Sequence, residues 1–280
     1  MARVIAHIGL HKTGTTYLQK EVLPQIRKLL DWDLVIGAPL ESKKVTKNVL
    51  LSAEGLSGAC MPQKNLINRK AGLEELSAFK RNGHEVRVVL FLRAHQDQIR
   101  SMFLQKRKQN LSHAKWSLDD YARILLGTPF SGYKDLLERL LDYPILLVDY
   151  DFFKKFPDAT EQGIFSFSGI EIAKEFKMST PPLRSTKKHN VSPSHILQMY
   201  VGDFIELTLL LINKLSTGRI NIKTKIIRRK LIPILLKFKL GPTVSYTLKN
   251  EDEDILNFYK QDWQGVWELA ERNESIQTLK

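Results

Sequence analysis

An apolar segment at the start of the chain runs directly into a loop rich in glycine and threonine, and a helical pattern follows. The segment reads RVIAHIGL over residues 3–10, and the loop continues as HKTGTT over residues 11–16. When a strand passes through such a loop into a helix, backbone N–H groups and the helix N-terminus face one anion. The pattern therefore predicts an α/β fold with a phosphate-binding loop after its first strand.

The position of the lysine separates this loop from a standard Walker A loop. In the Walker pattern GxxxxGK[ST], the lysine comes directly after the second glycine. Here Lys12 comes two residues before Gly14, and Thr15 follows that glycine. Lys12 still supplies a mobile positive charge, and Thr15 and Thr16 supply hydroxyl donors. We interpret the loop as a phosphate cradle outside the Walker group; the alternative is a polar turn with a surface lysine.

Strand patterns alternate with helical patterns as far as residue 150. We expect strands over 3–10, 34–36, 49–51, 86–92 and 144–150, and helices over 15–30, 71–82, 95–110 and 133–141. The segment at 86–92, VRVVLFL, is typical of a strand that is covered on both faces. The alternation predicts a three-layer α/β fold, with a mainly parallel sheet flanked by helices, in a single domain over residues 1–280.

The last third of the chain is helical in pattern and locally basic. We expect helices within 152–169 and over 194–215, 223–237 and 251–271, which form a helical C-terminal portion. The net charge is +13, and residues 207–250 contain ten basic residues and no acidic one. A basic helical segment, about 203–245, suits one anionic partner, such as an acidic glycan or a lipid surface. Nucleic-acid binding would predict basic charge throughout the fold. A helix packed on the core with a solvated basic face would give the same pattern.

The sequence also indicates a compartment. Cys60 is the only cysteine, so no disulfide forms within the chain, and this usage is typical of a reducing environment. The first predicted strand leaves no room for a signal peptide, and no apolar run is long enough to span a membrane. We expect a cytoplasmic protein, with peripheral membrane contact through residues 207–250 as a further interpretation.

A second group of phosphate-binding residues follows the most apolar predicted strand. Arg93 comes directly after that strand, and Ser101 follows eight residues later in a predicted helix. Strand ends in parallel sheets face the ligand crevice, and arginine offers a planar fork for two phosphate oxygens. The two residues are candidates for one phosphate site; the alternative is a salt-bridged arginine and an exposed serine.

Together the two motifs resemble the signatures of the sulfotransferases that use 3′-phosphoadenylyl sulfate (PAPS). In that family, a KTGTT-type loop binds the 5′-phosphosulfate, and an Arg and a Ser eight residues apart bind the 3′-phosphate. The similarity is greatest to bacterial-type members, in HIGLHKTGTTYLQ, LLSAEGL and LFLRAHQDQIRSMFLQ, and covers most of the chain outside 200–245. The resemblance implies a P-loop-NTPase-like fold. It assigns the 5′-phosphosulfate to Lys12, Thr13, Gly14, Thr15 and Thr16, and the 3′-phosphate to Arg93 and Ser101.

Two positions depart from the family pattern. Many members have proline two residues after the arginine, where this chain has His95, and tyrosine two residues after the serine, where it has Phe103. Neither change removes a predicted phosphate ligand.

Sulfuryl transfer to a hydroxyl needs a base that takes the hydroxyl proton. Glu54 follows the predicted strand at 49–51 and is our first candidate; a carboxylate that caps the start of a helix is the alternative. His11, in the loop itself, is the second candidate, unless its imidazole makes a structural hydrogen bond.

The resemblance implies transfer of a sulfuryl group from PAPS to an acceptor hydroxyl or amine without a metal, leaving 3′-phosphoadenosine 5′-phosphate (PAP). Arg184, Lys187 and Lys188 would close over the 3′-phosphate, or are solvated charges. We expect an acidic or sugar-containing acceptor, such as a glycan or glycolipid. Two alternatives stay open: a P-loop kinase or NTPase with Mg²⁺ near Asp149 and Asp151, and a non-enzymatic anion or membrane-surface binder.

Overall fold

The computed structural model describes residues 1–9, 17–37, 41–52, 62–109, 118–126, 132–169 and 253–280. The chain divides into two compact units. The first unit comprises Met1–Ile99, Arg123–Leu183 and Glu253–Lys280, and the second comprises Arg100–Ala122 and Arg184–Asp252. The first unit contains the sheet and most of the described helices.

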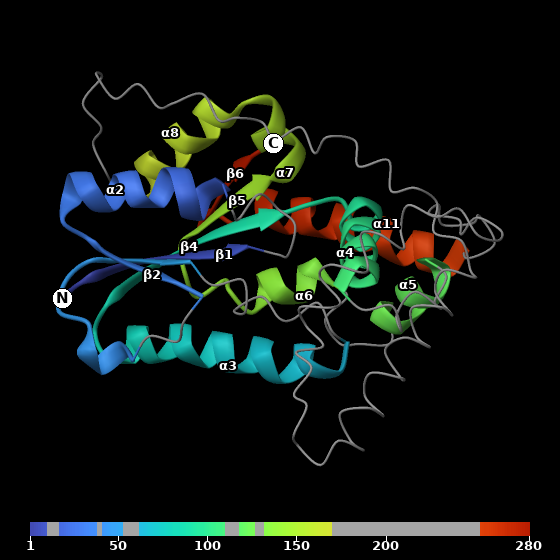
Figure 1. Cartoon of the computed structure of the whole chain (residues 1–280), viewed down its shortest axis with the longest axis horizontal. Helices are drawn as coiled ribbons and strands as arrows, with labels where there is room; N and C mark the ends of the chain where they lie inside the picture. The colour runs from blue at the N-terminus through green and yellow to red at the C-terminus, as the bar shows by residue number, and fades with distance from the viewer. Residues whose placement is uncertain (10–16, 38–40, 53–61, 110–117, 127–131, 170–252) are drawn as a thin grey trace, which may run out of the picture. The chain divides into compact units, whose positions relative to one another are not determined.

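A parallel sheet of six strands forms the centre of the first unit (Figure 1). The strands are β1 (Arg3–Gly9), β2 (Asp33–Ile36), β3 (Val49–Ser52), β4 (Glu85–Leu92), β5 (Ile145–Asp149) and β6 (Ile276–Leu279). Their order is β2-β3-β1-β4-β5-β6, and each neighbouring pair is parallel. The predicted α/β fold with a mainly parallel sheet is therefore confirmed.

Helices connect the strands. The described helical segments are the π-helix η1 (Leu18–Val22), α2 (Leu23–Leu30), the 3-10 helix η2 (Ser42–Lys44), α3 (Pro62–Arg81), α4 (His95–Gln109), α5 (Leu118–Leu126), α6 (Tyr133–Glu138), α7 (Tyr150–Lys155), α8 (Pro157–Phe167) and α11 (Glu253–Glu271). None of the helices in the described parts of the chain is long and apolar enough to cross a membrane.

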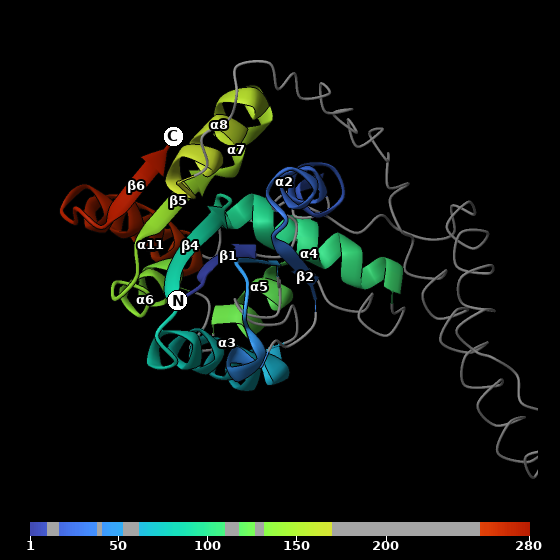
Figure 2. The same cartoon turned by 90° about the vertical axis from the view of Figure 1, so that its left-hand side faces the viewer.

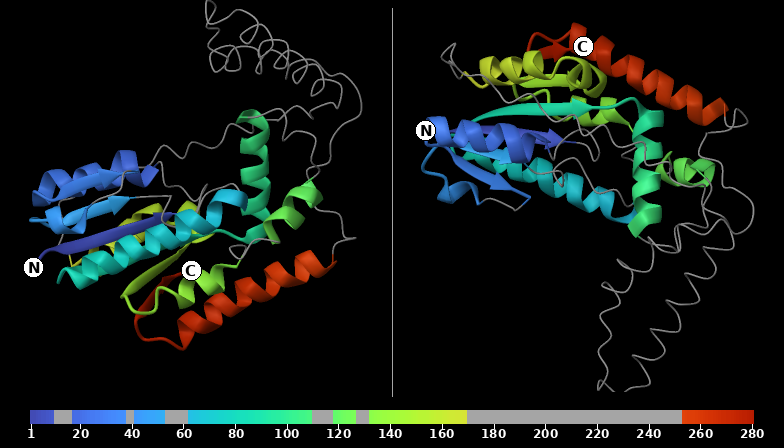
Figure 3. Two further views of the ribbon diagram at one scale, coloured as in Figure 1. Left: turned by 90° about the horizontal axis from the view of Figure 1, so that it is seen from below. Right: turned by 45° about the horizontal axis from the view of Figure 1, so that its top comes forward.

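Each face of the sheet has its own hydrophobic cluster, because successive side chains of a strand point to opposite faces. In β1, Val4 and Ala6 belong to one cluster and Ile5 belongs to the other. Helices α3, α6 and α11 cover the first face, and η1, α2, α7 and α8 cover the second. Figures 2 and 3 show these two layers on either side of the sheet. The expected three layers are present.

Several elements differ from the sequence predictions. Helix α3 begins at Pro62, well before the predicted start at residue 71. The predicted helix at 15–30 is described from Leu18, as a π-turn followed by α2. The short strand β6 was not predicted, because IQTL contains only two apolar residues and its pairing with β5 is a long-range contact. The helices predicted at 194–215 and 223–237 lie outside the described residues.

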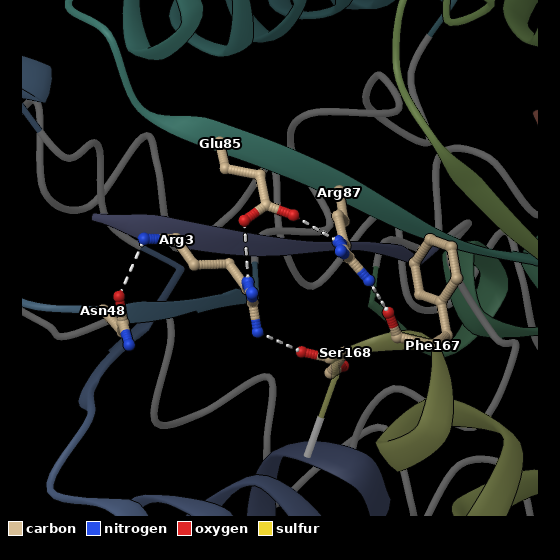
Figure 4. Close-up of polar contacts among 6 residues, drawn as sticks. All are labelled: Arg3, Asn48, Glu85, Arg87, Phe167 and Ser168. Atoms are coloured by element: carbon tan, nitrogen blue, oxygen red, sulfur yellow. Dashed lines mark hydrogen bonds and ion pairs between the residues drawn. The ribbon is translucent and has the colours of Figure 1, made fainter. Parts of the chain in front are cut away.

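A network of arginine and glutamate side chains ties the amino ends of the central strands to the end of α8 (Figure 4). Glu85 accepts hydrogen bonds from Arg3 Nε (2.9 Å) and Arg87 Nε (2.7 Å). The same arginines donate to the backbone carbonyls of Ser168 and Phe167. Burial alone would raise the pKa of Glu85, but the bonds and charges of the two arginines outweigh it and lower that pKa.

Gly169, which directly follows Ser168, allows the packing of the Arg3 side chain to be tested. Gly169 has φ +67°, and a Cβ there would lie 2.8 Å from Arg3 Nη1. Gly37 has φ +68° with nothing within 4 Å of its Cβ position. We expect Gly37→Ala to cost about 1 kcal/mol of stability for backbone strain alone, and Gly169→Ala about 2 kcal/mol or more, since Arg3 must also move. Urea unfolding measures both values, and equal losses would contradict the expected displacement of Arg3.

Candidate functional site

The carboxyl ends of four neighbouring strands lie along one edge of the sheet. In the parallel register Gly9 pairs with Phe91, and Leu92 pairs with Asp149, while His7 pairs with Ser52 on the other side of β1. Ligands of open α/β sheets bind at this edge. The predicted phosphate loop follows β1, the predicted base follows β3, and Arg93 follows β4. All three segments therefore begin at the carboxyl edge of the sheet.

Most of the predicted site residues lie outside the described parts of the chain. These are His11, Lys12, Thr13, Gly14, Thr15, Thr16, Glu54, Arg184, Lys187 and Lys188, together with the basic segment at 207–250. The structure describes β1 and η1, which flank the predicted phosphate loop, and β3 and α3, which flank the segment with Glu54. It also describes Arg93 and Ser101.

Arg93 comes directly after β4 and is half-buried. Its guanidinium carbon lies 5.0 Å from the centre of the Tyr150 ring, and Lys154 Nζ lies 5.2 Å from the same centre. Tyr150 is the first residue of α7, directly after β5, so the contact bridges two neighbouring strand ends. In a cation–π contact of this kind the positive charge is attracted to the face of the ring. Ser101 lies on α4, in the second unit, and is partly exposed.

The two departures from the family pattern are packing residues. His95 begins α4, is 4% exposed, and its Nε2 lies 2.7 Å from Asp262 Oδ2. In the second unit, Phe103 is buried, and its ring centre lies 5.5 Å from that of Tyr121. Both side chains therefore have structural roles in this fold.

A buried polar group at the strands that lead into the predicted loops was not predicted. His7 Nδ1, in β1, lies 2.8 Å from Ser52 Oγ at the end of β3. Gln19 on η1 donates to the same oxygen at 3.1 Å, and the His7 ring packs edge-on against Phe91. This group links β1, β3 and η1, the elements that border the predicted loops. A signal was present in the sequence, since His7 and Ser52 are polar residues within apolar strands.

A second polar contact, which is partly buried, involves Tyr17, at the start of the first described helical segment. The Tyr17 hydroxyl donates to Glu161 Oε1, on α8, at 2.6 Å. Burial raises the pKa of Glu161 to about 7; Tyr17 opposes this change and the charge of Asp158 adds to it. Burial and the nearby carboxylate also raise the pKa of Tyr17 above its usual value. Because buried charges are costly, the neutral acid is the favoured form of Glu161 in the folded protein below pH 7.

The acidic residues after β5 have local partners. Asp149 caps α7 by accepting the backbone N–H of Asp151 at 2.7 Å, and burial raises the pKa of its carboxyl. Asp151 pairs with Lys154. Within the described ranges, no group of three or more His, Cys, Asp or Glu side chains is arranged to hold a metal ion. The structure therefore gives these aspartates a capping and pairing role.

Comparison with known proteins gives structural likenesses only. No protein-family model and no curated protein matches the chain. A mouse sulfotransferase, SULT7A1, complexed with PAP matches with 18% identity and a TM-score of 0.42, over 61% of this chain and 61% of the mouse protein. A sulfotransferase from Alicyclobacillus acidocaldarius matches with 11% identity and a TM-score of 0.35, over 81% of this chain and 100% of that protein. Likeness at this level assigns no activity and no site residue to this chain.

The Tyr17–Glu161 contact predicts a specific pH dependence of stability. The pKa of Glu161 is about 7 in the folded protein, and its ordinary value of 4.5 applies to the unfolded chain. Between these two pH values the folded protein keeps the proton on Glu161, whereas the unfolded chain has released it. The stabilisation from this group is complete below pH 4.5 and is lost as the pH rises through 7. As the pH rises from 4.5 to 7, the free energy of unfolding of the wild type should fall by on the order of 2 kcal/mol relative to that of Glu161→Gln.

Urea unfolding over this pH range measures the difference. Glu138→Gln, at an exposed position on α6, is the matched control and should follow the wild type. Parallel pH profiles for the wild type and Glu161→Gln would contradict the assigned protonation.

Proposed function

We propose that this protein transfers a sulfuryl group from PAPS to an acceptor hydroxyl or amine. The observation that carries the proposal is the position of Arg93. It follows β4 directly, next to β1, the strand that leads into the KTGTT sequence, and its guanidinium lies against Tyr150 at the carboxyl edge. A nucleotide with phosphates at both its 5′ and 3′ positions requires two separate anion sites, and the two motifs supply them.

In the proposed reaction, the acceptor oxygen or nitrogen forms a bond to sulfur while the bond from sulfur to the 5′-phosphate oxygen breaks, releasing PAP. Lys12 and the N–H groups of its loop stabilise negative charge on the leaving phosphate. Thr13, Gly14, Thr15 and Thr16 hold the 5′-phosphosulfate. Glu54 takes the proton of the acceptor, with His11 as the alternative base. The mechanism uses no metal.

Arg93 and Ser101 hold the 3′-phosphate, which distinguishes this donor from ATP. Arg93 is suited to the role because a planar guanidinium binds two oxygens of one phosphate. We propose that Arg184, Lys187 and Lys188 close over the same phosphate. The support for these three residues is their charge in the sequence.

We further propose a glycan or glycolipid acceptor, a cytoplasmic location, and contact with an acidic acceptor or a membrane surface through residues 207–250. The support is the ten basic residues of that segment, which attract anionic partners. Residues 1–280 would act as one catalytic domain, in which the basic helical segment at about 203–245 is the acceptor- or surface-binding part.

Donor identity is tested by ligand-induced thermal stabilisation. PAP should raise the melting temperature, and ATP with Mg²⁺ should not. Lys12→Ala and Arg93→Ala should each weaken PAP binding about ten- to hundredfold, the loss typical of a charged hydrogen-bond donor. Lys43→Ala, an exposed lysine on η2, is the matched control and should bind PAP as the wild type does. Stabilisation by ATP with Mg²⁺ and none by PAP would support the kinase alternative instead.

The base is tested by turnover. In a screen of sugars, glycolipids and phenols with PAPS, Glu54→Gln should lower kcat about 10²–10⁴-fold and leave PAP affinity within about twofold, since a general base acts in the transition state. His11→Gln should have the smaller effect on kcat. If Glu54→Gln retains wild-type turnover and His11→Gln does not, His11 is the base.

A further inference from the structure

The pair formed by His95 and Asp262 is almost completely buried. Their side chains are 4% and 9% exposed, and His95 Nε2 lies 2.7 Å from Asp262 Oδ2. His95 is the first residue of α4, and Asp262 lies on α11, which is far away in the sequence. A buried carboxylate is costly unless hydrogen bonds compensate it, so the partners of Asp262 decide what the pair does.

Asp262 also holds the start of α6. It accepts the backbone N–H groups of Tyr133 at 2.7 Å and Lys134 at 3.2 Å. Gly132 precedes them, and a Cβ there would lie 3.0 Å from Asp262 Oδ1. Figure 3 shows α6 and α11 side by side on one face of the sheet. One carboxylate therefore joins α11, the first turn of α6 and the first residue of α4.

Aromatic rings fix the plane of the imidazole. The ring centre of His95 lies 3.8 Å from that of Tyr133, in a stacked arrangement, and 4.6 Å from that of Tyr259. Burial lowers the pKa of His95, and the hydrogen bond and charge of Asp262 only partly oppose this change. A neutral imidazole that donates from Nε2 to the Asp262 carboxylate is consistent with both observations.

Only Ala94 separates this anchored residue from Arg93. The Ala94 carbonyl accepts the N–H of Gln98 at 3.0 Å, so the regular hydrogen bonding of α4 begins there. The backbone of Arg93 is thus fixed by β4 on one side and by the anchored His95 on the other. Its guanidinium is in turn held against Tyr150.

We propose that His95 and Asp262 are positioning residues that set the place of the Arg93 guanidinium, so that helix α11 supports recognition of the donor's 3′-phosphate. The role in recognition of the 3′-phosphate rests on the proposed sulfotransferase function. The positioning itself rests on the contacts described above. The pair would act through Arg93 and would not touch the donor.

Selectivity for PAP over adenosine 5′-phosphate isolates this role, because the two ligands differ only in the 3′-phosphate. Asp262→Ala and His95→Ala should lower the ratio of the two affinities about tenfold or more, measured by calorimetry, while affinity for adenosine 5′-phosphate changes less than about twofold. Arg93→Ala should have the same effect, and the double variant Arg93→Ala/Asp262→Ala should lose little more than Arg93→Ala, because the two residues act in series.

Two further variants separate positioning from general destabilisation. His95→Gln keeps a side-chain donor for Asp262 and should restore selectivity to within about threefold of the wild type. His84, whose Nε2 lies 3.1 Å from the Ser42 carbonyl, is the matched control at the opposite edge of the sheet, and His84→Ala should leave selectivity unchanged. Equal loss of affinity for both ligands in Asp262→Ala and His95→Gln, or unchanged selectivity in Asp262→Ala, would overturn the proposal.

Hydrogen exchange in the ligand-free protein separates failure of this inference from failure of the proposed function. If the wild type does not prefer PAP, the donor assignment and the role in 3′-phosphate recognition both fail. Faster exchange of the amides from Arg93 to Ile99 in Asp262→Ala, and not in His84→Ala, would still support the positioning of Arg93. Unchanged exchange in Asp262→Ala would overturn it.

Discussion

The parallel pairing of β1 with β3 on one side and β4 on the other is the constraint on which the rest of the molecule depends. Parallel hydrogen bonding brings the carboxyl ends of these strands to one edge, whatever the sequence of the loops that follow. Strands β1, β3 and β4 are buried on both faces over most of their length, which restricts the connecting helices to two outer layers. The edge where chemistry is expected is therefore a consequence of strand direction.

Buried polar contacts hold the chain where strands pass into helices at this edge. His7 and Ser52 join β1 to β3, and Tyr17 joins the start of the first helical segment to α8. His95 joins the start of α4 to α11. Each contact fixes a position only because its burial makes an unmade hydrogen bond costly. The opposite edge has a different character, since Arg3, Glu85 and Arg87 form a charged network there that joins the strands to α8.

The amino and carboxyl edges of the sheet differ in how their charged side chains are paired. Charged groups that pair with one another, as Arg3 and Glu85 do, stabilise the fold and leave little to offer a ligand. The Arg93 guanidinium carbon lies 5.0 Å from the centre of the Tyr150 ring, and a planar guanidinium is a group that can bind two oxygens of one phosphate. Asp149 and Asp151, which in the sequence resemble a metal site, are instead engaged by a helix N-terminus and by Lys154.

The sequence by itself determined the fold class, the strands from β1 to β5 and the place of Arg93 at the end of β4, because these depend on local apolar patterns and on strand direction. Only the tertiary structure decided which polar residues meet. No spacing in the sequence relates His95 to Asp262, Tyr17 to Glu161 or His7 to Ser52, since each pair joins elements that come together through packing. The strand β6 belongs to the same class, because its four residues are stabilised by pairing with β5 and carry almost no local signal.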